Sequence, residues 1–142
     1  MLLEELPAWA RLMLNSERVA RLGLLDDDDH PRVLPVTFVV AGEAIYSAID
    51  KKPKRSNEPA RVRYLRRRPE AALTVDHYDD DWTQLAWVQL LGRVEVLDAA
   101  EDEPGMEALV AKYEPYRDEP PPGPLLRLVP ERALHWRADE TI

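Results

Sequence analysis

Residues 32–40 read Arg-Val-Leu-Pro-Val-Thr-Phe-Val-Val, an apolar run rich in β-branched residues that predicts a strand. An acidic turn over residues 26–30 separates this strand from another predicted over residues 19–25. A turn over residues 41–43 separates it from a third strand over residues 44–49. Because both connections are short and rich in turn residues, the three strands are expected to form an antiparallel meander.

Helical and extended patterns alternate outward from this meander. Residues 6–14 and 101–113 have apolar residues at helical spacing, and a helix over residues 59–68 ends before Pro69, because proline cannot continue it. Further strands are predicted over residues 71–75, over residues 82–97 with a bulge at Gly92, and over residues 125–129 with 133–136. This order predicts a mainly β, α+β fold, an antiparallel barrel that is closed or half-closed, with a few peripheral helices.

The composition fits one domain in a reducing compartment. The chain has 142 residues, 45% of them hydrophobic, which suits a single domain over residues 1–142. It has no cysteine, which excludes disulfides, iron–sulfur clusters and thiolate catalysis. It lacks both a run of about eighteen apolar residues and the basic start and apolar centre of a signal peptide. We therefore expect a cytoplasmic protein without a membrane partner.

The charge is distributed unevenly along the chain. The net charge is −8, yet residues 51–68 contain nine lysines and arginines and a single acid, Glu58. The first part of this segment is a loop between a predicted strand and a predicted helix, where free N–H groups and the helix dipole favour an anion such as phosphate. A solvated basic loop is the plainer interpretation. A nucleic acid is disfavoured, because the rest of the chain is acidic and Tyr64 is the segment's one aromatic residue.

Self-sufficient catalytic groups are missing from the sequence. His30, His77 and His135 have no metal-ligand spacing, and the acidic runs lack the calcium-loop pattern, so we predict no metal. The serines have no nucleophile-elbow setting. If the chain is an enzyme, a bound cofactor must therefore supply the chemistry, and no catalytic residue is assigned. Trp82 and Trp87 could wall a flat aromatic ring, or could equally be core or dimer-interface residues.

Taken in order, several stretches resemble a known superfamily. They are residues 32–38, residues 45–47 leading into 49–55, residues 61–73, residues 88–95, and residues 129–132 followed by Trp136. This series resembles the pyridoxamine 5'-phosphate oxidase-like superfamily of FMN-binding split β-barrels, which includes oxidoreductases that use the deazaflavin coenzyme F-420. The resemblance covers nearly the whole chain.

The resemblance also implies a cofactor site shared by two subunits. The second and third strands would contact the ring of the cofactor through Pro35, Val36, Thr37, Tyr46, Ser47 and Ala48. Basic residues before and within the helix would bind the cofactor phosphate through Lys51, Lys54, Arg55 and Arg61. The partner subunit of a homodimer would contribute Trp82 and Trp87.

The function implied is that of an oxidoreductase that passes a hydride from the cofactor to a small, electron-poor organic substrate. The four charges of the basic loop favour the deazaflavin F-420 over FMN, because extra carboxylates in the tail of F-420 would be neutralised there. A carrier of flavin, deazaflavin or haem without turnover is the alternative. Homodimerisation would cover Trp82, Trp87 and the apolar strand over residues 125–129, which a monomer would leave exposed.

Overall fold

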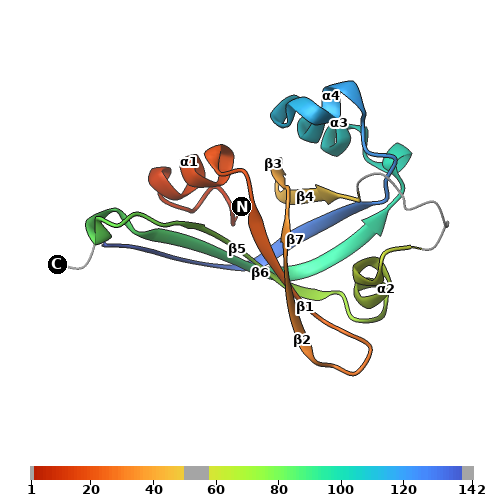
Figure 1. Cartoon of the computed structure of the whole chain (residues 1–142), viewed down its shortest axis with the longest axis horizontal. Coiled ribbons are helices and arrows are strands. Elements are labelled where there is room, and N and C mark those ends of the chain that lie inside the picture. Colours follow the sequence, from red (N-terminus) through yellow and green to blue (C-terminus); the bar gives the residue numbers. More distant parts are fainter. Residues whose placement is uncertain (1, 50–57, 139–142) are drawn as a thin grey trace.

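A computed structural model describes residues 2–49 and 58–138 of the chain (Figure 1). Its strands are β1 (Ala20–Leu25), β2 (Pro31–Val36), β3 (Val39–Ala41), β4 (Ala44–Ala48), β5 (Glu70–His77), β6 (Ala86–Leu97) and β7 (Leu125–Arg137). Its helices are α1 (Ala8–Ser16), α2 (Ala60–Arg67), α3 (Glu103–Lys112) and α4 (Glu114–Asp118), with 3-10 turns η1 (Trp82–Gln84) and η2 (Ala99–Glu101). None of the helices in these described ranges is long and apolar enough to cross a membrane.

The strands form one antiparallel sheet in the order β2-β1-β5-β6-β7-β4-β3, which confirms the predicted fold class. The one strand predicted over residues 32–40 is, however, two. β2 pairs with β1 and β3 pairs with β4, and Thr37 and Phe38 lie between them. The two edge strands of the sheet, β2 and β3, are therefore consecutive in the chain and are joined by Thr37 and Phe38. This short connection requires the sheet to curl and bring its two edges close together.

Tyr113, at the end of α3, satisfies the backbone at the break. Its hydroxyl accepts from the Phe38 N–H at 2.9 Å and lies 2.8 Å from the Phe38 carbonyl oxygen and 2.9 Å from that of Arg18. The Arg18 guanidinium stacks 4.7 Å from the centre of the ring. These contacts replace the ladder bonds that a continuous strand would have made.

The β6–β7 pairing carries the predicted irregularity at Gly92. Leu91 pairs with Arg132 and Gly92 with Pro130, so Glu131 is the extra residue and the bulge lies in β7. The long strand also begins later than predicted. Trp82–Gln84 form η1, because the carboxylate of Asp81 accepts from the Thr83 N–H at 3.1 Å and closes a turn.

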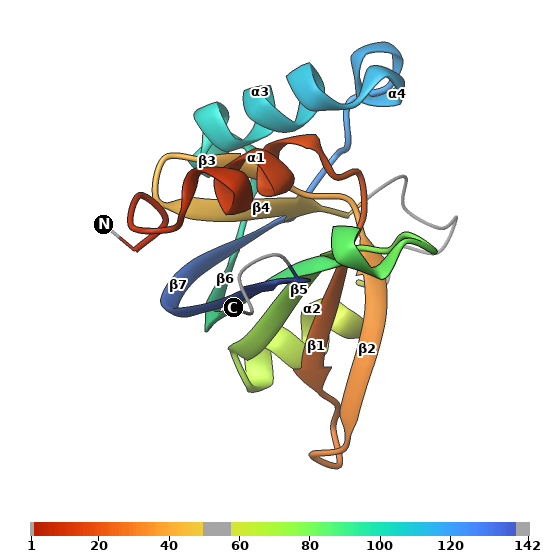
Figure 2. The same ribbon diagram turned by 90° about the vertical axis from the view of Figure 1, so that its left-hand side faces the viewer.

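Two layers of side chains meet at β4, whose five residues are all buried. Ile45 faces the main core inside the barrel, with Phe38 and Leu90, while Tyr46 faces a second cluster under α3. Figure 2 shows α3 and α4 lying over β3 and β4 on the outside of the barrel. The α3–α4 unit therefore covers β3, which follows the break, and its neighbour β4. Leu125, Leu126 and Leu128 of β7 are buried within the chain, so the prediction that a monomer would leave this strand exposed is wrong.

Candidate cofactor site

A pocket of about 200 Å³ opens at the split of the barrel, which is the gap between the end of β2 and the end of β4, beside the break at Thr37 and Phe38. It is lined by Val19, Pro35, Val36, Thr37, Ser47, Ala48 and Arg61. The end of β2, the end of β4 and the first turn of α2 thus bring together six of the residues that the sequence singled out. Their role in binding a cofactor remains a prediction.

Arg61 is the cation of this pocket. Its Nε is buried, and within the described part of the chain it has no hydrogen-bond partner. Pro59 starts α2 and gives it no side-chain cap, so Arg61 lies in a first turn whose N–H groups point toward the N-terminal end. An anion bound here would satisfy both the guanidinium and the helix end.

The other arginines of the α2 segment form ion pairs with acidic side chains. Arg63 pairs with Asp27 at 3.0 Å, and Arg67 and Arg68 both reach Asp29, at 3.0 and 2.9 Å. The hydrogen bond from Arg67 holds the pKa of Asp29 below its usual value. The acidic turn between β1 and β2 therefore neutralises much of the basic segment.

Arg66 follows the same pattern with a different acid, since it pairs with Glu58 at 2.7 Å. Among the described arginines of this segment, Arg61 is therefore the one without an ion pair to a described acid. Lys51, Lys54 and Arg55 belong to the loop before α2 and lie outside the described residues.

Tyr46 lies on the other side of β4 and does not line the pocket. Its ring packs against Gly105, where an added Cβ would come within 2.5 Å of it. Its hydroxyl donates to Asp102 at 2.6 Å and accepts from Arg127 Nε at 3.1 Å. Burial, and then the bond to Asp102, raises the pKa of this phenol. These contacts tie β4 to α3.

The two tryptophans also lie away from the pocket of their own chain. Trp87 pairs with Trp136 across β6 and β7, on the sheet face opposite α1, because the neighbouring His135 contacts Trp9 of α1. Trp82 lies at the tip of the β5–β6 hairpin, which projects from the body, and is 69% exposed (Figure 1). A role for either at a cofactor would have to be played in a partner subunit.

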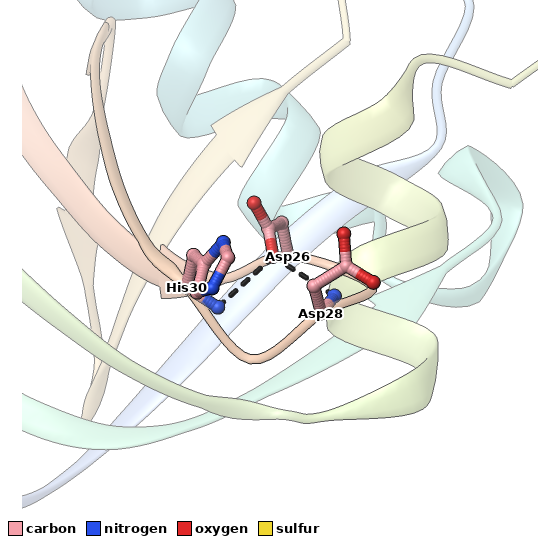
Figure 3. A group of neighbouring side chains, drawn as sticks. All are labelled: Asp26, Asp28 and His30. Carbon is pink, nitrogen blue, oxygen red and sulfur yellow. Dashed lines mark hydrogen bonds between the residues drawn. The ribbon is translucent and has the colours of Figure 1, made fainter.

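Asp26, Asp28 and His30 form a group whose side chains could hold a metal ion (Figure 3). The Asp26 carboxylate accepts from the backbone N–H groups of Asp28 at 2.9 Å and His30 at 3.0 Å. The bond to His30 contributes most to lowering the pKa of Asp26. These bonds close the β1–β2 turn and explain the cluster without an ion, so we assign no metal to it.

Tyr116 of α4 is a residue that the sequence reasoning missed. It is buried, and its hydroxyl lies 2.8 Å from Thr37 Oγ1, at the rim of the pocket. Its distance of three residues from Tyr113 continues the apolar face of α3 past Pro115, and this spacing is the signal that could have identified it.

Lys112 packs beside the same break in the sheet. Its Nζ lies 3.8 Å from the centre of the Phe38 ring and 3.5 Å from the Leu14 carbonyl oxygen. Burial, aided by the nearby Arg18 and opposed by Glu17, lowers the pKa of Lys112 from 10.5 to about 8. Between these two values the unfolded chain binds more protons than the folded chain.

The Lys112→Met variant is therefore expected to alter the pH dependence of stability. The wild-type free energy of unfolding should rise from about pH 8 toward about pH 10, as Lys112 loses its proton in the fold first. The free energy of unfolding of the variant, compared with that of the wild type, should be most favourable below about pH 8. This difference should shrink as pH rises. Urea unfolding across that range measures the difference, and a difference that stays constant would contradict the assignment.

A family model described as pyridoxamine 5'-phosphate oxidase matches residues 8–133. The chain belongs to this family. The match confirms the resemblance seen in the sequence and spans the pocket, α2 and most of β7. A comparison with curated protein sequences found no match.

Solved structures of the split-barrel type share the fold of this pyridoxamine 5'-phosphate oxidase family member. A conserved hypothetical protein from Mycobacterium tuberculosis has a TM-score of 0.73 at 18% identity, over 94% of this chain and 86% of that one. A FAD-binding protein from Mesorhizobium loti has a TM-score of 0.69 at 18% identity, over 92% and 94%. An F420 reductase has a TM-score of 0.68 at 19% identity, over 91% and 98%.

Proposed function

We propose that this family member is an oxidoreductase that binds the deazaflavin F-420, or FMN as the close alternative, in the pocket at the split. The observation that carries the proposal is Arg61, whose buried Nε has no partner among the described residues and borders strand ends from β2 and β4. An F420 reductase and a FAD-binding protein with the same fold support this cofactor class.

The residues of the pocket fit such a cofactor. Arg61 would hold an anionic group, Thr37 and Ser47 would supply hydroxyls, and Pro35, Val36 and Ala48 would exclude water. When bound, the cofactor would supply the hydride chemistry, and the chain would orient it against an electron-poor substrate. The preference for F-420 rests on the composition of the loop with Lys51, Lys54 and Arg55.

Titration with F-420 and with FMN, followed by absorbance and fluorescence, tests the proposal. We expect one of them to bind, and its reduced form to be oxidised by a member of a panel of quinones and enones. Binding without turnover would instead favour a carrier protein. If neither cofactor binds, the proposed function is wrong.

The same protein should be a homodimer. The pocket of about 200 Å³ is smaller than the roughly 300–1,000 Å³ of most ligand sites, so a second chain would complete it. The sheet face with Trp87 and Trp136 also carries Leu91 and Leu134, and Val33 on it is 69% exposed. Sedimentation velocity at micromolar concentration should give twice the 16.3 kDa of one chain.

A pair of variants locates this interface. Leu134→Glu would place a charge on the face with Trp87 and should yield monomers. Leu12→Glu, in α1 and already 67% exposed, should remain dimeric. A wild-type monomer, or equal behaviour of the two variants, would contradict a dimer built on this face.

A nucleic-acid partner is not proposed. The arginines of α2 that could contact a phosphate backbone are paired with Asp27, Asp29 and Glu58. We expect no retention on DNA or RNA columns at physiological salt.

A further inference from the structure

Two tyrosines from the α3–α4 unit hold the two residues at the break. Tyr113 bonds to the backbone of Phe38, and Tyr116 bonds to the side chain of Thr37. The two tyrosine rings pack edge to face, with centres 5.6 Å apart and planes at 63°. Because both rings are buried, each hydroxyl is held in place by its packing as well as by its bond.

The chemistry of the two hydroxyls suggests the direction of the 2.8 Å bond between Tyr116 and Thr37. A phenol is far more acidic than an aliphatic alcohol, so the phenol is the better donor and the alcohol the better acceptor. With Tyr116 donating, the hydrogen of Thr37 Oγ1 is left for another acceptor. Thr37 lines the pocket, whereas Tyr116 does not.

We propose that Tyr116 is a positioning residue, which holds the Thr37 hydroxyl so that it donates a hydrogen bond to an acceptor atom of the molecule bound in the pocket. The proposal rests on the proposed function and adds a requirement to it. The ligand must present an acceptor, such as a carbonyl oxygen, to the end of β2, while its anionic group lies toward Arg61. The site would thus select a ligand by two polar groups, an anion at Arg61 and a hydrogen-bond acceptor at Thr37.

A merely structural role for Tyr116 would be to anchor α4 on the barrel. The two roles differ in which quantity changes, cofactor affinity or stability. If Tyr116 acts through Thr37, loss of its hydroxyl weakens cofactor binding, and in a Thr37→Val background the same loss has no further effect on binding. If Tyr116 only anchors α4, loss of its hydroxyl lowers the free energy of unfolding and leaves cofactor affinity unchanged.

A double-mutant cycle with F-420 and FMN as probes separates these roles. Tyr116→Phe keeps the ring and should weaken binding of the preferred cofactor roughly two- to ten-fold. Thr37→Val, close in shape to threonine, should weaken it at least as much, and the double variant no further. Thr37→Ser keeps the hydroxyl and should retain most of the affinity. Tyr64→Phe, on α2 and outside the pocket lining, should bind as wild type.

The outcomes are distinct for the proposal and for the function on which it rests. Wild-type chain that binds neither probe overturns both. Wild-type binding with additive effects of Tyr116→Phe and Thr37→Val overturns the proposal and leaves the function standing. Thermal unfolding checks each variant; should Tyr116→Phe fail to fold, equal affinities of Thr37→Ser and Thr37→Val would still overturn the donor role of Thr37.

Discussion

Replacing Arg61 with methionine is expected to weaken cofactor binding about ten- to hundred-fold while the fold survives. A charge-assisted hydrogen bond to an anion contributes roughly 1.5–3 kcal/mol of binding free energy, and methionine keeps most of the apolar stem. The Nε of Arg61 has no partner among the described residues, so its removal breaks no internal bond there. Fluorescence titration of F-420 and FMN, with thermal unfolding alongside, measures both quantities.

Arg63→Met is the matched control for this variant. Arg63 lies two residues further along α2, is paired with Asp27 at 3.0 Å, and does not line the pocket. Because this ion pair is exposed and screened by solvent, its loss should change stability little and leave cofactor affinity unchanged. Equal dissociation constants for wild type and Arg61→Met would move the anion site away from the pocket.

Gly92→Ala is expected to destabilise the protein by about 3 kcal/mol or more. A Cβ at Gly92 would overlap the Val129 carbonyl oxygen and lie 3.1 Å from the Pro130 Cα, both of them backbone atoms of the bulged strand β7. Backbone in the centre of a sheet cannot move aside as a flexible side chain can. Thermal or urea unfolding should show a loss on the order of 10 °C in Tm.

Gly23→Ala provides the comparison within the same sheet. Its Cβ would meet the Ala72 carbonyl oxygen at 3.7 Å, an ordinary van der Waals contact. Alanine in a strand also loses less conformational entropy on folding than glycine, so stability should change by less than about 1 kcal/mol. A Gly92→Ala variant as stable as Gly23→Ala would show that the bulge in β7 can relax.

Local patterns in the sequence predicted most elements, because each depends on neighbours in the chain. Pro59 and Pro69 flank α2, and short turns join β1 to β2 and β3 to β4. The break at Thr37 was not predictable in this way. The Phe38 backbone bonds to Tyr113, seventy-five residues further on, and nothing in the alternation of residues 32–40 reveals that partner.

The strand ends and Arg61, which the sequence singled out, line one pocket, and their role in binding a cofactor stays a prediction. The sequence did not predict the ion pairs of the basic segment. Neutralisation of this segment requires the acidic turn at Asp27 and Asp29 to lie against α2, a contact that depends on the folded sheet. The orientation of Tyr46 away from the pocket could have been predicted from the sequence. Adjacent residues of a strand face opposite sides of the sheet, and Tyr46 is adjacent to Ser47.

Because β4, which borders the pocket, pairs with the last strand of the sheet, the pocket is expected to form late in folding. Ser47 and Ala48 pair with Leu126 and Leu125 of the last strand, and the Thr37 rim needs Tyr116. A nascent chain that has not yet released β7 from the ribosome can build the β1–β2 hairpin but cannot assemble the site. Such long-range closure slows folding, so cofactor capture would mark the end of maturation after synthesis.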